Sequence, residues 1–402
     1  MTTTPTSDDT QPRPPLDGLI VADFSRVLAG PMATMTLADL GATVIKVERP
    51  GSGDDTRSWG PPWTPAGSSY FESVNRSKRS VCLDLSDPDD LEVAQRLARR
   101  ADVVIHNFLP GLIERSGLDY RSVSADNPGV VYCGISGFGP EDGAQMPGYD
   151  FVVQAMGGLM SITGDAEGEP TKVGVALVDI LTGKDATVAI LAALSARDRD
   201  AVGQQLDVNL MSSLLGALAN QSSSYLATGR SPGRMGNHHP SVAPYEPVQC
   251  RDALVVVACG NDRQFGALAQ VVGVPELASD ERFATNGARV ENRKALTAIL
   301  EEQLRGDDAA VWESRMREAG VPAGRVADIG GAFDTATDLG LRPIVEMPEG
   351  FTAQVAHPVR YSRTPISAFL PPPGLGEHTD AVREWLSGDD ALPRPDSSSD
   401  IG

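Results

Sequence analysis

Asp179 is the residue whose type and surroundings point most directly to chemistry. It stands in the apolar run Val175-Ala-Leu-Val-Asp-Ile-Leu-Thr-Gly183, and burying a lone carboxylate among such side chains is costly. One interpretation is a helix N-cap, whose carboxylate accepts backbone N–H hydrogen bonds. The other is a nucleophile or base in a cleft, with its charge stabilised by the N-terminus of a buried helix. The two roles are compatible, and both stay open at this point.

Two glycine-containing stretches precede this run, Met156-Gly-Gly-Leu-Met160 and Thr163-Gly164. Because glycine has no side chain, such stretches let the backbone approach a ligand closely. They are equally typical of a turn between two helices, so the spacing alone leaves both interpretations open.

Basic residues gather early in a strongly acidic chain. The balance is 34 Lys and Arg against 54 Asp and Glu, a net charge of −20, which argues against nucleic acid and anionic membrane surfaces as partners. A local basic cluster can clamp phosphates, although a solvated face is its commoner role. The cluster consists of Lys46, Arg49, Arg57, Arg76, Lys78 and Arg79.

Several other sites are not supported by any motif. The chain has no GxGxxG, Walker or GxSxG pattern, which gives no support to dinucleotide binding, nucleotide hydrolysis or serine-hydrolase chemistry. His238 and His239 lack metal-ligand spacing, so we expect no metal site. The four cysteines lack CxxC spacing and read as free thiols. With no visible signal peptide and no apolar run approaching about 20 residues, we expect a cytoplasmic protein.

An alternation of strands and helices must position Asp179. Helices are expected from about 31 to 41, after a cap at Ser86 or Asp87, and from 179 to about 195. This rhythm predicts an α/β fold in which a parallel sheet is flanked by helices on both faces. Short apolar runs predict strands at 19–24, 43–48, 80–85, 101–107 and 130–136, and a further strand leading into a helix over 205–228.

The chain length predicts two domains. The tails are expected to be disordered, a Gly/Pro/Ser/His-rich stretch to be a linker, and a smaller α/β domain to follow it, with a strand at 253–259 and helices covering about 262–272 and 289–319. The predicted boundaries are 1–15 for a disordered tail, 16–228 for the first part of the large domain, 229–247 for the linker, 248–350 for the small domain, 351–388 for a return to the large domain and 389–402 for a second disordered tail.

Seven stretches, in order along roughly residues 16 to 385, resemble the family III CoA-transferases, the group of formyl-CoA:oxalate CoA-transferase. Each is weak singly, but their order is highly specific. They are Phe24–Pro31, Leu40–Asp54, Asn75–Ser80, Ala101–Gly111, Gly148–Asp150, Gly236–Ser241 and Gly376–Asp380.

The resemblance implies a fold and a mechanism. Members of the family are two-domain α/β proteins whose two chains form a homodimer of interlocked rings, with a large domain built from both ends of the chain. The catalytic aspartate of the family falls on Asp179, which would attack an acyl-CoA thioester and then carry CoA as an aspartyl thioester. Amides of the glycine-rich segments would stabilise the oxyanions. CoA is thus expected as a substrate, with no permanently bound cofactor.

The same resemblance assigns CoA-binding positions. Leu28 stands where the oxalate enzyme has glutamine, and Ser136 stands where it has lysine, so oxalate and formate are doubtful substrates. The positions carried over are Leu28, Ala29, Arg49, Leu83, Asp84, Asn107, Phe108, Arg115, Ser136, Gly137, Phe138 and Gly139.

Three functions stay open under this resemblance. Alpha-methylacyl-CoA racemase shares the fold, but its histidine base is replaced here by Tyr149, a poor base at neutral pH, which favours transfer. A non-catalytic CoA-binding subunit is disfavoured because Asp179 is intact. The closest similarity is to the succinyl-CoA:glutarate type, which implies dicarboxylic acids as donors and acceptors. That similarity lies in 236–245, 260–265 and 292–294.

Overall fold

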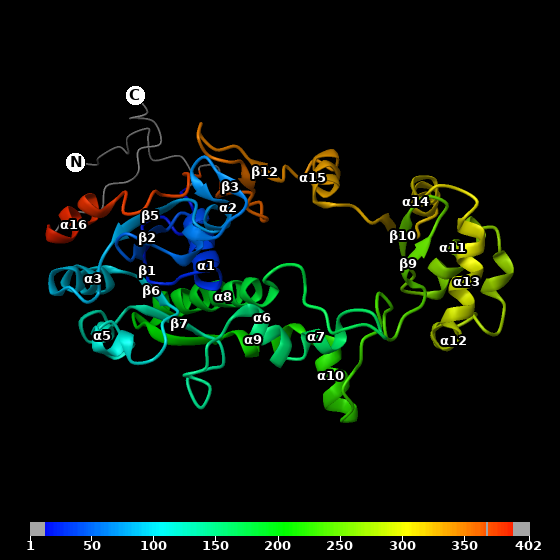
Figure 1. Cartoon of the computed structure of the whole chain (residues 1–402), viewed down its shortest axis with the longest axis horizontal. Coiled ribbons are helices and arrows are strands. Elements are labelled where there is room, and N and C mark those ends of the chain that lie inside the picture. The colour runs from blue at the N-terminus through cyan, green and yellow to red at the C-terminus, as the bar shows by residue number, and fades with distance from the viewer. Residues whose placement is uncertain (1–12, 367–368, 389–402) are drawn as a thin grey trace, which may run out of the picture. The chain divides into compact units, whose positions relative to one another are not determined.

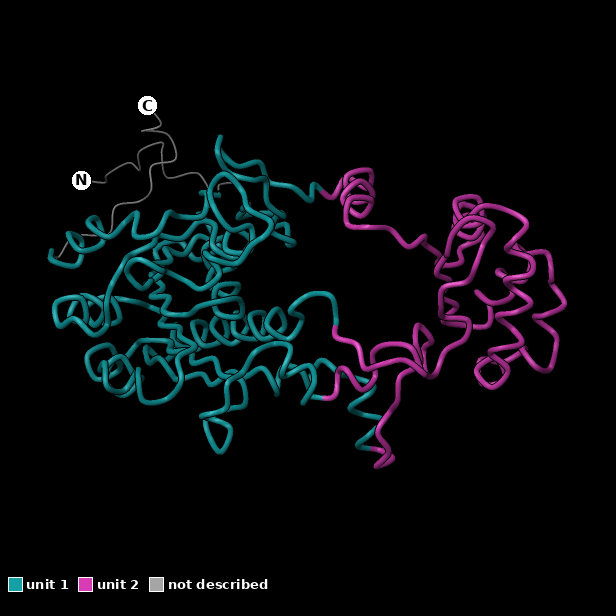
Figure 2. The backbone as a smooth tube through the Cα atoms, in the orientation of Figure 1, with its two compact units in different colours: residues 1–157, 173–226, 342–402 teal, residues 158–172, 227–341 magenta. Residues whose placement is uncertain are grey.

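The computed structural model describes residues 13–366 and 369–388. The predicted disordered tails, 1–15 and 389–402, lie outside these ranges apart from residues 13–15. The chain divides into two compact units (Figure 2), and the domain boundaries proposed from the sequence stay a prediction. Unit 1 comprises residues 1–157, 173–226 and 342–402, and unit 2 comprises 158–172 and 227–341.

A six-stranded parallel sheet forms the centre of unit 1 (Figure 1), as the alternating pattern predicts. The first strand in the sequence, β1, lies inside the sheet, where it pairs with β2 on one side and β6 on the other. The order across the sheet is β5 (Lys78–Cys82), β2 (Thr43–Glu48), β1 (Ile20–Asp23), β6 (Val103–His106), β7 (Val131–Ser136) and β8 (Gln204–Asn209).

Helices cover both faces of this sheet (Figure 1). On one face α1 (Ala29–Asp39) packs against α8 (Leu177–Asp200). On the other, α3 (Pro88–Arg100) and α16 (Thr379–Ser387) bury Leu97 and Trp385 in one apolar core. Helix α3 begins where the sequence predicts, because the Asp87 carboxylate accepts hydrogen bonds from the next backbone amides and Pro88 suits the first turn.

Helix α8 begins earlier than its sequence pattern predicts. Its N-cap residue is Ala176, which places Asp179 inside the first turn. The interpretation of Asp179 as an N-cap is therefore wrong, and another residue must satisfy the free amides at this end of the helix.

Unit 2 contains a three-stranded antiparallel sheet packed against helices. The helical stretch predicted over 289–319 is divided among α12, α13 and α14, because Asn292 and the segment 305–308 interrupt it. The sheet order is β11 (Ala323–Arg325), β10 (Leu254–Ala258) and β9 (Tyr245–Gln249), and the main helices are α11 (Asp262–Val271), α12 (Asn286–Glu291), α13 (Arg293–Leu304), α14 (Ala309–Glu318) and α15 (Ile329–Asp338).

Shorter elements complete the chain. They are η1 (Asp55–Ser58), β3 (Trp63–Thr64), β4 (Gly67–Ser68), α2 (Ser69–Glu72), α4 (Leu112–Arg115), α5 (Tyr120–Asp126), α6 (Asp150–Met156), α7 (Leu159–Ile162), α9 (Leu210–Ala217), α10 (Ala219–Thr228), η2 (Pro275–Ala278), β12 (Ile344–Val345) and β13 (Gln354–Val355). Across residues 13–366 and 369–388, no helix is both long and apolar enough to cross a membrane.

Candidate active site

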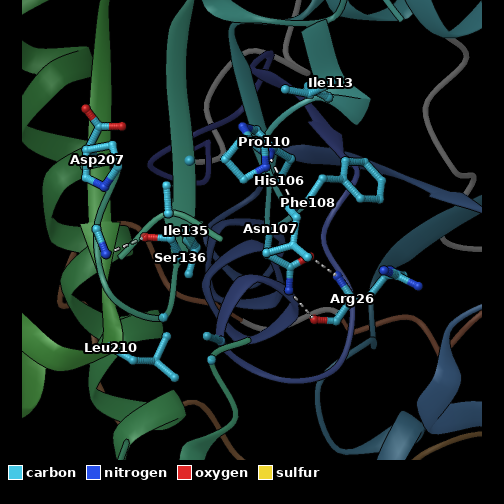
Figure 3. A pocket seen from close by; sticks show the side chains of 18 of the residues that line it. Arg26, His106, Asn107, Phe108, Pro110, Ile113, Ile135, Ser136, Asp207 and Leu210 are labelled. Atoms are coloured by element: carbon cyan, nitrogen blue, oxygen red, sulfur yellow. Dashed lines mark hydrogen bonds between the residues drawn. The ribbon is translucent and has the colours of Figure 1, made fainter. Parts of the chain in front are cut away.

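A cavity of about 580 Å³ lies at the carboxyl ends of strands in unit 1 (Figure 3). Its wall includes Arg26 after β1, Asn107 and Phe108 after β6, Ser136 at the end of β7, and Asp179 from the first turn of α8. Ligands of open parallel sheets bind at this edge, because the loops that leave the strands gather there.

The cavity brings together seven of the thirteen residues predicted for the site. Of the other six, Leu28 packs in a buried cluster with the start of α8, Leu83 lies in the apolar core, and Arg49, Asp84 and Arg115 are exposed outside the lining. Phe138 is half-buried beside lining glycines. The seven lining residues are Ala29, Asn107, Phe108, Ser136, Gly137, Gly139 and Asp179.

Two glycines allow two backbone segments of the cavity wall to touch. A Cβ on Gly137 would lie 2.4 Å from the Cα of Gly148, and one on Gly148 would lie 2.2 Å from the Cα of Gly137, distances that no side chain tolerates. The earlier pair behaves differently, because Gly157 ends α6 and Gly158, with φ of 86°, begins α7. The turn interpretation is thus confirmed for Gly157 and Gly158, which do not line the cavity.

Buried charges hold the loop that follows β1. The Lys46 ammonium donates to the Ser25 carbonyl at 2.9 Å and to the Asp54 carboxylate at 2.8 Å, and the Val27 amide donates to the same carboxylate at 3.2 Å. Asp54, Asp23 and Glu48 together overcome the effect of burial, which would lower the pKa of Lys46, and raise it instead. The side chains of Lys46 and Asp54 are both fully buried, so each needs the other.

A second buried pair holds the first turn of α1, which follows the same loop. Lys78 donates to the Pro31 carbonyl at 2.9 Å and lies 3.2 Å from the Asp23 carboxylate. Both interpretations of the basic cluster, a phosphate clamp and a solvated face, are therefore wrong for Lys46 and Lys78, which are inaccessible to solvent. The sequence could not reveal this, because the partner carboxylates come from other strands and loops.

Val27 shows how firmly this loop is held. Its φ of 71° lies in the left-handed region, which is a strained conformation for a β-branched residue. Flanking hydrogen bonds over-determine it, since the Asp54 carboxylate binds the Val27 amide and Asn107 binds both backbone groups of Arg26. The strain therefore sits in the segment that contributes Arg26 and Val27 to the cavity.

We expect Val27→Gly to loosen this segment. The variant relieves the strain but loses apolar packing, so the free energy of unfolding changes by less than about 1 kcal/mol, whereas KM for an acyl-CoA rises roughly tenfold because the loop is less pre-organised. The matched control is Ala201→Gly at the C-terminal end of α8, where φ is 57°. Steady-state kinetics and denaturant unfolding should show a more stable control with an unchanged KM. An equal KM in both variants would contradict this role of the loop.

Asp150, from the start of α6, supplies the cap of α8. One of its carboxylate oxygens accepts hydrogen bonds from the Val178 amide at 2.7 Å and the Asp179 amide at 3.3 Å. Its other oxygen accepts from the Gln154 side chain at 2.6 Å, and Gln154 in turn accepts from the Val173 amide at 2.9 Å. The cap role that the sequence suggested for Asp179 thus belongs to Asp150, which leaves the Asp179 side chain available.

The Asp179 carboxyl group has an altered acidity. Burial, and then the neighbouring Asp150 carboxylate, raise its pKa from 3.8 to about 7. The part of the chain that the structure describes gives the Asp179 carboxylate no hydrogen-bond donor. Tyr70 is a neighbour of this group that the sequence does not indicate. Burial, and then the Asp179 and Asp150 carboxylates, raise the pKa of Tyr70 to about 12. A carboxylate with a raised pKa in a cleft is typical of a catalytic group.

We expect Asp150→Asn to move the pH dependence of the reaction to lower pH. Removing the like charge lowers the pKa of Asp179, so the carboxylate forms at lower pH and the acid limb of kcat/KM shifts with it. Asparagine caps a helix about as well as aspartate, so the fold is retained. The measurement is kcat/KM against pH, with the exposed Asp185→Asn on the same helix as control. A limb that stays in place would contradict the electrostatic coupling of Asp150 to Asp179.

Comparison with known proteins decides the family. The family model described as CoA-transferase family III matches residues 16–379. The chain belongs to CoA-transferase family III. It is 40% identical to succinyl-CoA:glutarate CoA-transferase of Mus musculus, over 91% of this chain and 85% of that protein. It is 42% identical to succinate–glutarate CoA-transferase of Agrobacterium fabrum, over 91% and 94% respectively.

A solved structure agrees with this membership. A CAIB/BAIF family protein from Brucella suis is 44% identical, covers 94% of this chain with all of its own, and superposes with a TM-score of 0.84. The sequence prediction of a family III CoA-transferase is confirmed. The protein is therefore an enzyme that uses CoA thioesters as substrates.

The structure of this CoA-transferase also shows the surroundings of Tyr149 and His238, two residues that the sequence analysis considered. Tyr149 is exposed, lines the cavity, and directly precedes α6. In unit 2, His238 is hydrogen-bonded to Glu246, which also pairs with Arg293. Across the described ranges no group of three or more His, Cys, Asp or Glu side chains is placed to hold a metal ion.

Proposed function

We propose that this CoA-transferase moves CoA from succinyl-CoA, or another dicarboxylyl-CoA, to a free carboxylic acid, with Asp179 as the covalent carrier. The observation that carries the proposal is a half-buried carboxyl group with a pKa of about 7 in the wall of a cavity, at the first turn of α8. The dicarboxylic substrates rest on the names of the relatives, several of which act on succinyl-CoA with glutarate.

The proposed reaction proceeds through two kinds of intermediate. An oxygen of the Asp179 carboxylate attacks the thioester carbonyl, the carbon–sulfur bond breaks, and CoA leaves as thiolate from a mixed anhydride. The thiolate then attacks the Asp179 carbonyl, which releases the donor acid and leaves an aspartyl-CoA thioester. The acceptor carboxylate repeats these steps in reverse, so every bond broken is matched by one formed and no oxidant or reductant is needed.

The cavity supports this chemistry in two ways. The N-terminus of α8 stabilises negative charge near Asp179 whenever its side chain is a free carboxylate during the reaction. Gly137 and Gly148 line the cavity and let two segments of its wall pack backbone against backbone, which gathers main-chain groups that can serve as oxyanion donors. We therefore place the oxyanion donors in this wall and not at Gly157 and Gly158.

The remaining assignments are proposals of the same kind. CoA is a substrate and no cofactor is bound permanently. Two chains form an interlocked homodimer in the cytoplasm, without nucleic-acid or membrane partners. We assign CoA contacts to Leu28, Ala29, Arg49, Leu83, Asp84, Asn107, Phe108, Arg115, Ser136, Gly137, Phe138 and Gly139, of which six line the cavity with Asp179.

A substrate panel tests the proposed function. The protein is incubated with succinyl-CoA and with dicarboxylic or monocarboxylic acids of matched chain length, and the acyl-CoA products are identified by mass spectrometry. We expect transfer to dicarboxylic acids. Deuterium exchange alpha to the thioester is followed in parallel without an acceptor acid. Exchange without transfer would contradict the proposal and favour a racemase.

A further inference from the structure

The charges that line the cavity do not match its proposed substrates. Both CoA and a dicarboxylyl group are anionic, so a wall that binds them needs cations. Among the described lining residues, guanidinium groups come only from Arg26 and Arg121, and Arg121 is exposed on α5. The carboxylates that line the same cavity are Asp55, Glu114, Asp119, Asp179 and Asp207.

We propose that Arg26 binds an anionic group of the substrate in this cavity, either the free carboxylate of a dicarboxylyl-CoA or a phosphate of its CoA. The proposal rests on the proposed function and names the residue that recognises its substrate. Arginine suits this role, because its planar fork of N–H donors matches a carboxylate or phosphate with two parallel hydrogen bonds.

The backbone of Arg26 is fixed before any ligand binds. Its amide donates to the Asn107 side-chain oxygen at 3.0 Å, and its carbonyl accepts from the Asn107 side-chain nitrogen at 2.8 Å (Figure 3). The residues on either side, Ser25 and Val27, are held by Lys46 and Asp54. Arg26 therefore starts from a defined position, which lowers the entropy lost on binding.

The side chain of Arg26 has unused hydrogen-bonding capacity. Its Nε is buried and, within the described residues, has no hydrogen-bond partner. The nearest carboxylate, that of Asp55, lies 3.5 Å from Nη1 in a partly exposed pair, a long and weak contact. The guanidinium carbon lies 5.6 Å from the centre of the Phe108 ring, another part of the cavity wall. The partly exposed guanidinium group therefore keeps N–H donors that an oxyanion in the cavity can accept from.

The test compares CoA and butyryl-CoA, which carry the same phosphates, with succinyl-CoA, which adds one free carboxylate. Dissociation constants for CoA, butyryl-CoA and succinyl-CoA are measured by calorimetry, in an Asp179→Ala background that prevents turnover. We expect Arg26→Gln to weaken binding of succinyl-CoA by about 10- to 100-fold, as for the loss of a charge-assisted hydrogen bond. A loss confined to succinyl-CoA identifies the free carboxylate, and an equal loss for all three ligands identifies a CoA phosphate.

Two further variants separate recognition from structure. Arg26→Lys should recover part of the affinity, because it retains the charge but not the fork. Asp55→Asn should leave affinity unchanged or improve it, because it releases the guanidinium. Unchanged affinity for all three ligands in Arg26→Gln, or an equal loss in Asp55→Asn, would overturn the proposal. Absence of transfer by the wild-type protein would instead refute the proposed function. The dissociation constants for CoA would in that case still test the role of Arg26.

Discussion

Asp179→Asn is expected to abolish CoA transfer while making the protein more stable at neutral and alkaline pH. Loss of the covalent carrier lowers kcat by a factor on the order of 10⁴ or more, because the amide cannot form the anhydride. CoA binding persists, since it depends on other parts of the cavity wall. Single-turnover assays and CoA titration measure the two properties separately.

The gain in stability follows from the raised pKa of Asp179. A carboxyl group whose pKa rises from 3.8 to about 7 on folding favours the folded state fully below pH 4 and loses that advantage as pH rises through 7. Compared with the neutral asparagine variant, the wild-type protein therefore loses stability progressively from about pH 4 upward. Above pH 7 its free energy of unfolding is lower than that of the variant by an amount on the order of 4 kcal/mol.

Denaturant unfolding of both proteins at several pH values measures this difference. The control is Asp185→Asn, an exposed acid on the same helix, for which transfer is retained and stability changes by less than about 0.5 kcal/mol. Retained transfer in Asp179→Asn would contradict the catalytic role of Asp179. A loss of stability at every pH would contradict the raised pKa of its carboxyl group in the folded protein.

Among the residues that hold the loop after β1, Lys46→Met should be the most destabilising single change. It leaves the Asp54 carboxylate buried without its cation, which costs about 3–5 kcal/mol. Lys46→Met with Asp54→Asn should recover most of this loss, because the amide is neutral and still accepts from the Val27 amide. The double variant should nevertheless keep a raised KM for acyl-CoA, since the Ser25 carbonyl has lost its partner.

The contrast between buried and exposed pairs provides the control. Arg96 and Glu92 form an exposed pair one helical turn apart on α3, and Arg96→Ala should cost less than about 0.5 kcal/mol. Thermal and denaturant unfolding of the three variants, with KM values, complete the comparison. If the double variant is as unstable as Lys46→Met, an uncompensated buried charge is not the cause of the loss.

The sequence predicts elements well where local signals are strong. Strands β1 and β6 are short apolar runs, and Asp87 with Pro88 marks the start of α3, whereas β5 and β8 are largely polar in sequence. Sequence cannot predict the order of strands across the sheet, because that order depends on how crossovers pack.

The sequence points to Asp179 as the catalytic residue, which stays a prediction. Its interpretation as a helix cap fails, because the true cap, Asp150, precedes it by 29 positions and approaches only through tertiary packing. Lys46 and Lys78 resemble surface cations in the sequence, since their partners Asp54 and Asp23 become neighbours only after folding. Arg26 lies inside the motif Phe24–Pro31, yet nothing local in the sequence marks its unpaired nitrogen.

Oxygen transfer to Asp179 tests the central claim most directly. The protein turns over succinyl-CoA with glutarate whose carboxylates carry oxygen-18, and the peptide that contains Asp179 is then analysed by fragment mass spectrometry. In the proposed mechanism the acceptor carboxylate supplies the bridging oxygen of the second anhydride, and that oxygen stays on Asp179 when glutaryl-CoA departs. We therefore expect oxygen-18 in the Asp179 carboxyl group. Glutaryl-CoA formation with an unlabelled Asp179 would contradict the mechanism.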